Sequence, residues 1–267
     1  MHIIVCIKQI MDPESAASGF RIDESAKKAV VADGTPLVVS PFDAQATEAA
    51  LRIRDEIGDC KITILSMGPD SAREAIKQCL AMGADEGVLL CDPAFEGADS
   101  YSTAFVLAEA TRKIGDYDLI LTGRQAADTD FGVVGIGIGE LLGIPVVTIA
   151  KEVLVHGRTV RVERVLQDGF ETVETALPAV VTVSNELGEP RYPKLKQLLQ
   201  AARKRMTVWS AVDLGVDVAN VGSTGARLEI EKLFVPERTN RCEFIDGESP
   251  QQVAAQLVGR LRELNVL

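Results

Sequence analysis

Glycines and carboxylates gather in one short stretch, residues 123–143, whose sequence is GRQAADTDFGVVGIGIGELLG. It follows an apolar run, residues 117–122, that is typical of a buried strand. If a helix begins near Phe131 and Gly132, the free amides from Phe131 to Val134 would face an anion such as a phosphate. Each interior glycine costs a helix about 1 kcal/mol relative to alanine. The glycines therefore indicate either backbone that meets a phosphate or a helix packed very close to a sheet.

Other chemistries find less support in the sequence. The pattern G-x-G-x-x-G is not satisfied, and the G-x-G pieces lie inside the predicted helix, which disfavours a hydride-transferring Rossmann enzyme. Asp128 and Asp130 could ligate magnesium, but paired acids at a helix start more often act as caps or dipole partners. Glu163, Asp168 and Glu171 fall on predicted antiparallel strands or a turn and form no evident acid–base pair. We expect no metal and no catalytic residue.

Composition excludes further classes of function. The chain has 267 residues, of which 46% are hydrophobic, enough for a well-buried core. Its net charge of −11 argues against binding to nucleic acid or to an anionic membrane. Only His2 and His156 could serve a catalytic triad or a histidine metal site. The five cysteines form no C-x-x-C pair, and no apolar run approaches the ~20 residues that cross a bilayer. We expect a cytoplasmic protein without stable membrane insertion.

The elements that must position the glycine-rich stretch follow from the alternation of apolar and helical segments. The expected strands are residues 2–8, 61–68, 86–92 and 117–123, the expected helices are residues 43–58, 70–83, 99–115 and 193–205, and a hairpin is expected over residues 20–34. This order predicts an α/β fold with a mostly parallel sheet covered on both faces. From Pro145 to Val183, apolar and polar residues alternate between turns, which predicts consecutive antiparallel strands that extend the sheet.

Local signals mark several helix ends. Asp43 is the expected N-cap of the first helix, and Ser71 with Glu74 has the spacing of a capping box. Residues 207–249 show no sustained period and are rich in loop formers, which predicts an arm that runs over a surface. The chain closes with a helix for which Ser249 supplies the cap and Pro250 the first turn.

Ligands of an open parallel sheet bind at the carboxyl ends of its strands. Four predicted loops lie there: residues 7–12, 66–71, 91–100 and 122–132. The last is the most suggestive, because it leads into the glycine-rich helix.

The predicted helix over residues 193–205 carries apolar and basic faces. Leu195, Leu198, Leu199 and Ala202 have helical spacing, and five lysines and arginines surround them. Sequence physics alone favours a core-facing helix with a solvated basic face. Against the acidic background, the basic patch could also steer a partner.

Several segments together resemble the β subunit of electron transfer flavoproteins: SPFDAQATEAALRIRDE, CLAMGADEGVLL, GRQAADTD and above all ALPAVVTVSNELGEPRYPKL. The resemblance runs from the first strand to about Val212. It implies a Rossmann-like fold of the adenine nucleotide α-hydrolase-like type. It further implies a nucleotide-binding α/β domain over residues 1–212, with a partner-recognition loop at about residues 185–200. Residues 213–267 would form a C-terminal arm and helix that contact an α subunit.

The resemblance also implies a function. Such β subunits have no reaction of their own; with an α subunit they form an electron carrier whose FAD is held mainly by α. The carrier takes electrons from acyl-CoA dehydrogenases, as in fatty acid β-oxidation, or from NADH, and delivers them to a quinone reductase or ferredoxin. The β subunit binds AMP in simple carriers and a second FAD in electron-bifurcating relatives. The chief alternative is a stand-alone adenine-nucleotide sensor of the universal stress type, whose G-x-x-G-x-[ST] loop this chain lacks.

The nucleotide site that the resemblance implies lies at the strand ends already singled out. It comprises Cys6, Ser40, Pro41, Phe42, Asp43, Met67, Gly123, Arg124, Gln125, Ala126, Asp128, Thr129, Asp130, Phe131, Gly132, Val133 and Val134. Ser40 and Val133 stand where many relatives carry asparagine and glutamine, whereas Arg124, Val134 and Gly135 resemble the bifurcating type, which favours FAD. Gly132 would let backbone meet the phosphate. Gly135, Gly137 and Gly139 would serve close helix packing.

Two further sites come from the resemblance. Glu163 matches a residue near the flavin of the α subunit, where a carboxylate would disfavour the reduced anionic flavin and so tune its potential. Glu189, Pro190, Arg191, Tyr192 and Leu195 match the partner-recognition loop. By this resemblance, Leu195 would be the apolar anchor that enters a pocket on the dehydrogenase.

Overall fold

A nine-stranded sheet organises the computed structural model, which describes residues 1–15, 19–236 and 242–267. In chain order its strands are β1 (His2–Ile7), β6 (Lys61–Met67), β7 (Glu86–Leu90), β8 (Leu119–Gly123), β9 (Val146–His156), β10 (Thr159–Leu166), β11 (Gly169–Ala176), β12 (Ala179–Val183) and β13 (Met206–Trp209). Their order across the sheet is β11-β10-β9-β12-β8-β1-β6-β7-β13. Two small antiparallel pairs stand beside it: β2 (Gln9–Met11) with β5 (Leu37–Val39), and β3 (Phe20–Asp23) with β4 (Lys28–Val31). The expected hairpin is thus confirmed.

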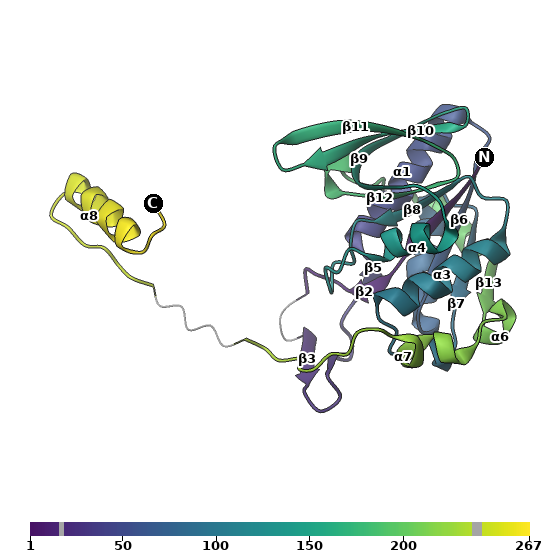
Figure 1. Ribbon diagram of the computed structural model, residues 1–267, viewed down its shortest axis with the longest axis horizontal. Helices are drawn as coiled ribbons and strands as arrows, with labels where there is room; N and C mark the ends of the chain where they lie inside the picture. The colour runs from purple at the N-terminus through teal and green to yellow at the C-terminus, as the bar shows by residue number, and fades with distance from the viewer. Residues whose placement is uncertain (16–18, 237–241) are drawn as a thin grey trace.

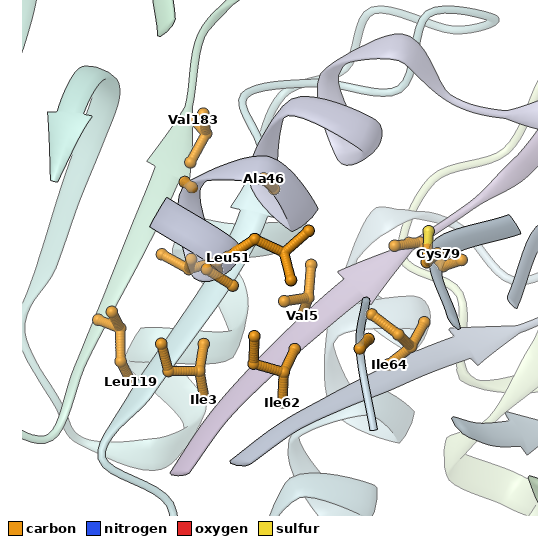
Figure 2. Packing of buried hydrophobic residues seen from close by; sticks show 14 of the residues in the cluster. Ile3, Val5, Ala46, Leu51, Ile62, Ile64, Cys79, Leu119 and Val183 are labelled. Carbon is orange, nitrogen blue, oxygen red and sulfur yellow. The ribbon is translucent and has the colours of Figure 1, made fainter. Parts of the chain in front are cut away.

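Helices cover both faces of this sheet (Figure 1). The α-helices of the described chain are α1 (Pro41–Ile57), α2 (Arg73–Met82), α3 (Ser100–Ile114), α4 (Val134–Leu142), α5 (Leu195–Ala201), α6 (Ala211–Leu214), α7 (Gly222–Gly225) and α8 (Pro250–Glu263), of which α8 does not lie on the sheet. Successive side chains of a strand point to opposite faces. Ile3 and Val5 of β1 therefore pack with Leu51 of α1 (Figure 2), whereas Ile4 lies in the cluster on the opposite face. The expected α/β class with a mostly parallel sheet is confirmed.

The extension of the sheet differs in part from its prediction. β9, β10 and β11 form an antiparallel meander, as expected. β12, however, lies between β8 and β9 and pairs in parallel with both, so the expectation of consecutive antiparallel strands is wrong for it. All five residues of β12 are buried. A continuous apolar run of this kind suits the interior of a parallel sheet rather than an edge with one wet face.

Two predicted helix starts are also corrected. Ser40, not Asp43, is the N-cap residue of α1, with Pro41 in the first helical position that suits proline. Ser71 donates its hydroxyl to Oε1 of Gln9 (2.8 Å) instead of capping α2, which follows a short 3₁₀ turn. Both side chains make contacts with distant segments, which local spacing cannot reveal. The cap of α8 is confirmed, because the Ser249 side chain accepts from the amide of Gln252.

The region beyond residue 206 contains more structure than expected. Residues 206–209 form β13, which pairs in parallel with β7 at the edge of the sheet. Four residues are too few for a period to show, so this strand was missed. Farther on, residues 226–236 leave the α/β body without forming a helix or strand, and α8 stands apart from that body (Figure 1). Within the described part of the chain, α8 buries none of its residues. Among these same residues, no helix combines the length and apolar character needed to cross a membrane.

Candidate functional site

The carboxyl ends of β1 and β8 meet the first turn of α1 at one edge of the sheet, and Asp43 joins them. The amide of Lys8 donates to Oδ2 of Asp43 (2.8 Å), and the amide of Gly123 donates to Oδ1 (3.0 Å). Ser40 lies one turn earlier, and its hydroxyl accepts from the amide of Ala127 (3.4 Å). The structure therefore brings the α1 residues and the start of the glycine-rich stretch together.

Burial sets the electrostatics of this edge. It raises the pKa of Asp43 to about 7, against the opposing effect of the two amide donors and of Lys8. The pKa of the Cys6 thiol is raised strongly, first by burial and then by the charge of Asp43. A thiol with so high a pKa stays protonated and is no nucleophile. Cys6 thus lines the edge as a small apolar group, and Met67 ends the neighbouring strand β6.

Gly123 marks a point of very close approach. A Cβ atom at this position would lie 2.5 Å from Oδ1 of Asp43 and 2.7 Å from Cβ of Phe42. No other residue fits between β8 and the start of α1. The loop that follows therefore begins with its backbone against that of α1.

The loop after Gly123 contains an arginine, Arg124, whose guanidinium is partly buried. The guanidinium of Arg124 lies over the ring of Phe42, 5.1 Å from its centroid. Its Nε atom is buried and has no hydrogen-bond partner among the described residues. A buried donor of this kind is costly unless something accepts from it, at about 1–3 kcal/mol or more. Phosphate oxygens are natural acceptors for a guanidinium, so the residues present fit a phosphorylated ligand.

Ion pairs and hydrogen bonds fold the acidic part of the same loop. Lys8 Nζ lies 2.7 Å from Asp128, and Gln125 donates to Oδ1 of Asp130 (2.6 Å). Asp130 and Gly132 adopt positive φ angles of 55° and 61°. The two aspartates that suggested a metal site are thus each held by a neighbour within the protein. The side chains of Phe131 and Val133 are exposed.

Helix α4 begins later than expected, at Val134 instead of near Phe131. The left-handed conformations at Asp130 and Gly132 cannot continue into a helix, which moves the start past them. The first helical hydrogen bond runs from the amide of Gly137 to the carbonyl of Val133. The amides without an intrahelical partner are therefore those of Val134, Gly135 and Ile136.

Close packing explains why α4 contains glycines despite their cost to helix stability. A Cβ at Gly135 would lie 2.6 Å from Oγ1 of Thr122, and one at Gly139 would lie 2.1 Å from Cγ2 of Val146. At Gly137 it would lie 2.8 Å from Cβ of Ala104. The expectation that these glycines serve close packing is confirmed: two face the sheet and one faces α3.

Glu163 lies elsewhere in the fold. It belongs to β10, which β9 and β12 separate from β8. Its carboxylate is 3.3 Å from Nζ of Lys151, and the pairing with β9 shifts register directly after it. Such irregularities re-aim side chains and are frequent beside functional sites. The structure does not bring Glu163 to the edge between β1 and β8.

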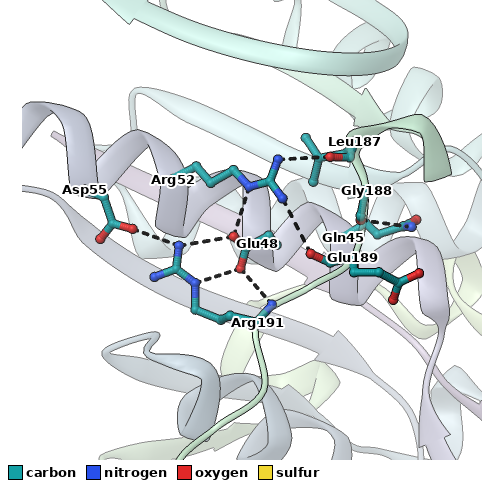
Figure 3. Close-up of polar contacts among 8 residues, drawn as sticks. All are labelled: Gln45, Glu48, Arg52, Asp55, Leu187, Gly188, Glu189 and Arg191. Carbon is teal, nitrogen blue, oxygen red and sulfur yellow. Dashed lines mark hydrogen bonds and ion pairs between the residues drawn. The ribbon is translucent and has the colours of Figure 1, made fainter.

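The predicted partner loop is fastened to α1 by Arg191 (Figure 3). The guanidinium of Arg191 donates to both carboxylate oxygens of Glu48 (2.7 and 3.1 Å) and to Asp55 (2.8 Å). Glu48 also accepts from Arg52, whose other end reaches the carbonyl of Leu187. Burial tends to raise the pKa of Glu48, but the hydrogen bonds from Arg191 and Arg52 outweigh it and leave that pKa lowered.

Apolar side chains next to this loop face the solvent. Tyr192 is 89% exposed and Leu195, the first residue of α5, is 74% exposed. Leu198 and Leu199 are exposed as well, and Ala201 is the one residue of α5 that is buried. The expectation of a core-facing helix is therefore wrong. α5 packs on α2, and Ala201 is its one buried side chain.

Sequence reasoning missed three residues that shape these sites. Lys8 holds both Asp43 and Asp128, Glu48 holds Arg191, and Lys204 donates to the carbonyls of Leu80 and Ala84 at the end of α2. Each is a charged residue in a helix or beside a strand, where a solvated side chain is the ordinary expectation. Glu48 differs from an ordinary surface glutamate only in its burial, and burial is a property of the folded structure that the residue type does not show.

The fold and the edge between β1 and β8 define a Rossmann-like α/β protein. Residues 28–214 match the family described as "Electron transfer flavoprotein domain". The chain is 39% identical over 263 residues to electron transfer flavoprotein subunit beta of Clostridium acetobutylicum, covering 98% of each protein. It is 36% identical over 267 residues to caffeyl-CoA reductase-Etf complex subunit CarD of Acetobacterium woodii (100% of each), and 36% identical over 276 residues to protein FixA of Azorhizobium caulinodans (99% of this chain and 96% of that one). The chain therefore belongs to the electron transfer flavoprotein β-subunit family.

Proposed function

We propose that the chain is the β subunit of a heterodimeric electron carrier, in which an α subunit holds most of the FAD. Full-length similarity to β subunits supports this assignment. The exposed apolar side chains of the C-terminal region also support it, because surfaces of this kind mark protein interfaces. In this proposal, residues 1–212 form the nucleotide-binding domain, and residues 213–267 form the arm and helix that contact the α subunit. A stand-alone sensor of the universal stress type would leave the β9–β12 extension and the arm without a use.

The edge between β1 and β8 is proposed to bind an adenine nucleotide, either AMP or a second FAD. The observation that carries this is the Nε of Arg124, which is buried and has no hydrogen-bond partner among the described residues, in the loop that leads to the first turn of α4 and its free amides. Together they supply a charged donor and backbone donors for phosphate oxygens. Ser40, Asp43 and the loop from Gly123 to Val134 would enclose the nucleotide. A second FAD in this site would supply a redox centre that takes a hydride from NADH and divides its two electrons.

Partner docking is assigned to Leu195 and the exposed residues around it. An apolar anchor flanked by lysines suits a complex that forms quickly and also releases quickly. The electron donors would be acyl-CoA dehydrogenases or NADH, and the acceptors a quinone reductase or ferredoxin. A relative whose name places it in a caffeyl-CoA reductase complex supports a partner that acts on CoA esters.

Glu163 is proposed to tune the flavin of the α subunit. A carboxylate close to that flavin would disfavour its reduced anionic form. The test is Glu163→Gln in the heterodimer, with Glu174→Gln on β11 as the control. The variant at 163 should raise a flavin midpoint potential, and unchanged potentials at both flavins would refute the role.

The decisive experiment is to co-express the chain with its α subunit, purify the complex, and count FAD and AMP per heterodimer after denaturation. Two FAD would support a bifurcating flavoprotein, and one FAD with one AMP would support a simple carrier. One FAD with no second nucleotide would refute the proposed β site. Failure of the chain to form any complex with α would refute the assignment as a carrier subunit.

A further inference from the structure

The loop between β7 and α3, residues 91–100, is covered by a later part of the same chain. This loop is one of the four at the carboxyl ends of strands where the sequence allowed a ligand. In the structure, Oδ2 of Asp92 accepts from the amide of Ala211 (3.0 Å), and the carbonyl of Glu96 accepts from the amide of Ser223 (2.9 Å). The chain's own backbone thus occupies the place that a ligand would take.

Two glycines make this contact possible. Gly222 adopts a φ of 57°, and a Cβ there would lie 2.1 Å from the carbonyl oxygen of Ala94. Gly97 has a φ of 72°, and its Cβ would lie 2.9 Å from Cβ of Ser223. Both positions combine a left-handed backbone with close approach, which only glycine meets without strain. The two segments are therefore fitted to each other.

Asp99 completes the contact, and its two carboxylate oxygens accept hydrogen bonds from different segments. Oδ1 caps α3 by accepting from the amide of Ser102 (2.8 Å). Oδ2 accepts from the amides of Arg227 (2.7 Å) and Leu228 (2.9 Å), which begin the extended arm. These amides outweigh the effect of burial and lower the pKa of Asp99, so it is ionised and its hydrogen bonds are charge-assisted. The guanidinium of Arg227 also lies over the ring of Tyr101, at 3.5 Å from its centroid.

Beyond this point the arm presents apolar side chains to the solvent. Leu228, Ile230, Phe234 and Val235 are all more than half exposed, and Phe244 is 82% exposed. In Figure 1 the arm runs from α7 past β3, and Asp99 holds it at its start, residues 227–228. A segment of this composition needs a partner to cover it.

We propose that Asp99 is a positioning residue for subunit assembly. By holding the amides of Arg227 and Leu228, it directs the arm toward the partner subunit before the two meet. Fixing a binding segment in its bound course reduces the entropy lost on association. This inference rests on the proposed function only in naming the α subunit as the partner.

The test is Asp99→Asn in the full-length chain. The asparagine keeps one oxygen for Ser102, and asparagine is a good N-cap, so α3 is preserved. Its NH₂ group, however, cannot accept from Arg227 and Leu228. The matched control is Asp217→Asn, since Asp217 accepts from the amide of Ala219 at the start of a 3₁₀ turn and, among the described residues, makes no hydrogen bond to the extended segment that begins at Arg227.

Two readouts separate an anchor from a merely structural residue. Hydrogen exchange at the amides of Arg227 and Leu228 should become about tenfold faster in Asp99→Asn, with α3 unchanged. Affinity for the α subunit should fall about tenfold, and the Asp217→Asn control should change neither. Unchanged exchange at these amides would overturn the anchor, and faster exchange with unchanged affinity would overturn its role in assembly. If even the unaltered chain binds no α subunit, the proposed function fails, while the exchange measurement still reports on the anchor itself.

A second pair of variants tests the same contact from the side of the arm. Arg227→Pro removes one of the two amide donors and the stacking on Tyr101, whereas Arg227→Ala removes only the stacking. The preceding residue, Ala226, already has the extended backbone that a following proline requires. Affinity for α should fall more in the proline variant than in the alanine variant. Equal affinities of these two variants for the α subunit would overturn the proposal. Neither variant changes a residue of α3.

Discussion

Arg191 and Glu48 lie 143 residues apart in sequence and are joined by three hydrogen bonds, two from the guanidinium and one from the backbone amide of Arg191. Glu48 is in the middle of α1, the helix whose first turn carries Asp43. One helix therefore contributes to the candidate nucleotide edge and also holds the loop that precedes α5. The side chain of Arg191 is engaged within the protein, whereas Tyr192 and Leu195 are exposed.

Replacement of Glu48 by glutamine should loosen the loop around Arg191. The variant loses the charge that binds two arginines while Asp55 still holds one of them, so the unfolding free energy should fall by about 2 kcal/mol. Urea denaturation measures the change. Glu74→Gln removes an exposed pair with Lys77 on α2 and should change stability by less than about 0.5 kcal/mol. Equal effects of the two variants would contradict the buried role of Glu48.

Asp43 should make stability depend on pH near neutrality. Burial raises its pKa in the folded chain to about 7 from 3.8, so the folded state binds the proton more tightly than the unfolded state. Its stabilising contribution is therefore full below the unfolded pKa and is lost as the pH rises through about 7. Between about pH 5.5 and about pH 8, the stability of the unaltered protein relative to Asp43→Asn should fall by about 2 kcal/mol. A difference that is constant with pH would contradict the raised pKa.

Alanine at two helical glycines should have opposite effects. At Gly139 the new methyl group would lie 2.1 Å from Val146, and overpacking of this kind costs about 1–3 kcal/mol. At Gly259 in α8 nothing lies within 4 Å of the new atom, so the gain in helix propensity should stabilise α8 by about 0.5–1 kcal/mol. Thermal unfolding tests the first variant, and hydrogen exchange within α8 tests the second. A stabilising Gly139→Ala would refute the close-packing account of α4.

Arg124→Ala should separate nucleotide binding from folding. Without nucleotide the variant removes an unpaired buried donor and a stacking contact with Phe42, so stability should change by less than about 1 kcal/mol. Affinity for AMP or FAD should nevertheless fall at least tenfold, or about 1.4 kcal/mol. Thermal unfolding with and without added nucleotide measures both effects. The control is Arg158→Ala, which removes a pair with Asp118 at the opposite edge of the sheet and should leave nucleotide affinity intact.

Leu195→Ala should impair partner docking without destabilising the fold. Because the side chain is 74% exposed, the unfolding free energy should change by less than about 0.5 kcal/mol. The rate of electron transfer from the dehydrogenase should fall at least tenfold if this residue is the anchor. Val212→Ala, an apolar residue of α6 that is also highly exposed, serves as the control. Equal rates for the two variants would refute the assignment of the docking surface to Leu195.

The strand–helix alternation could be predicted because the parallel strands of this fold are buried on both faces. HIIVCI of β1 and LILTG of β8 are thus nearly continuous apolar runs. For the same reason the place of β12 in the sheet could not be predicted, because an apolar run does not reveal which strands it will pair with. The start of α4 was placed too early because left-handed conformations at Asp130 and Gly132 are not visible in residue types alone.

By itself the sequence determined the α/β class, the family resemblance, and the glycine-rich stretch at the end of a strand. These depend on local composition and spacing, which are the same whether or not the chain is folded. Only the tertiary structure decided which distant groups meet. It placed Asp43 against the amide of Gly123, 80 residues away, turned α5 outward, and filled the loop of residues 91–100 with the chain's own arm. Such pairings depend on how the layers pack, because each carboxylate or amide bonds to whatever group the folded backbone brings within reach.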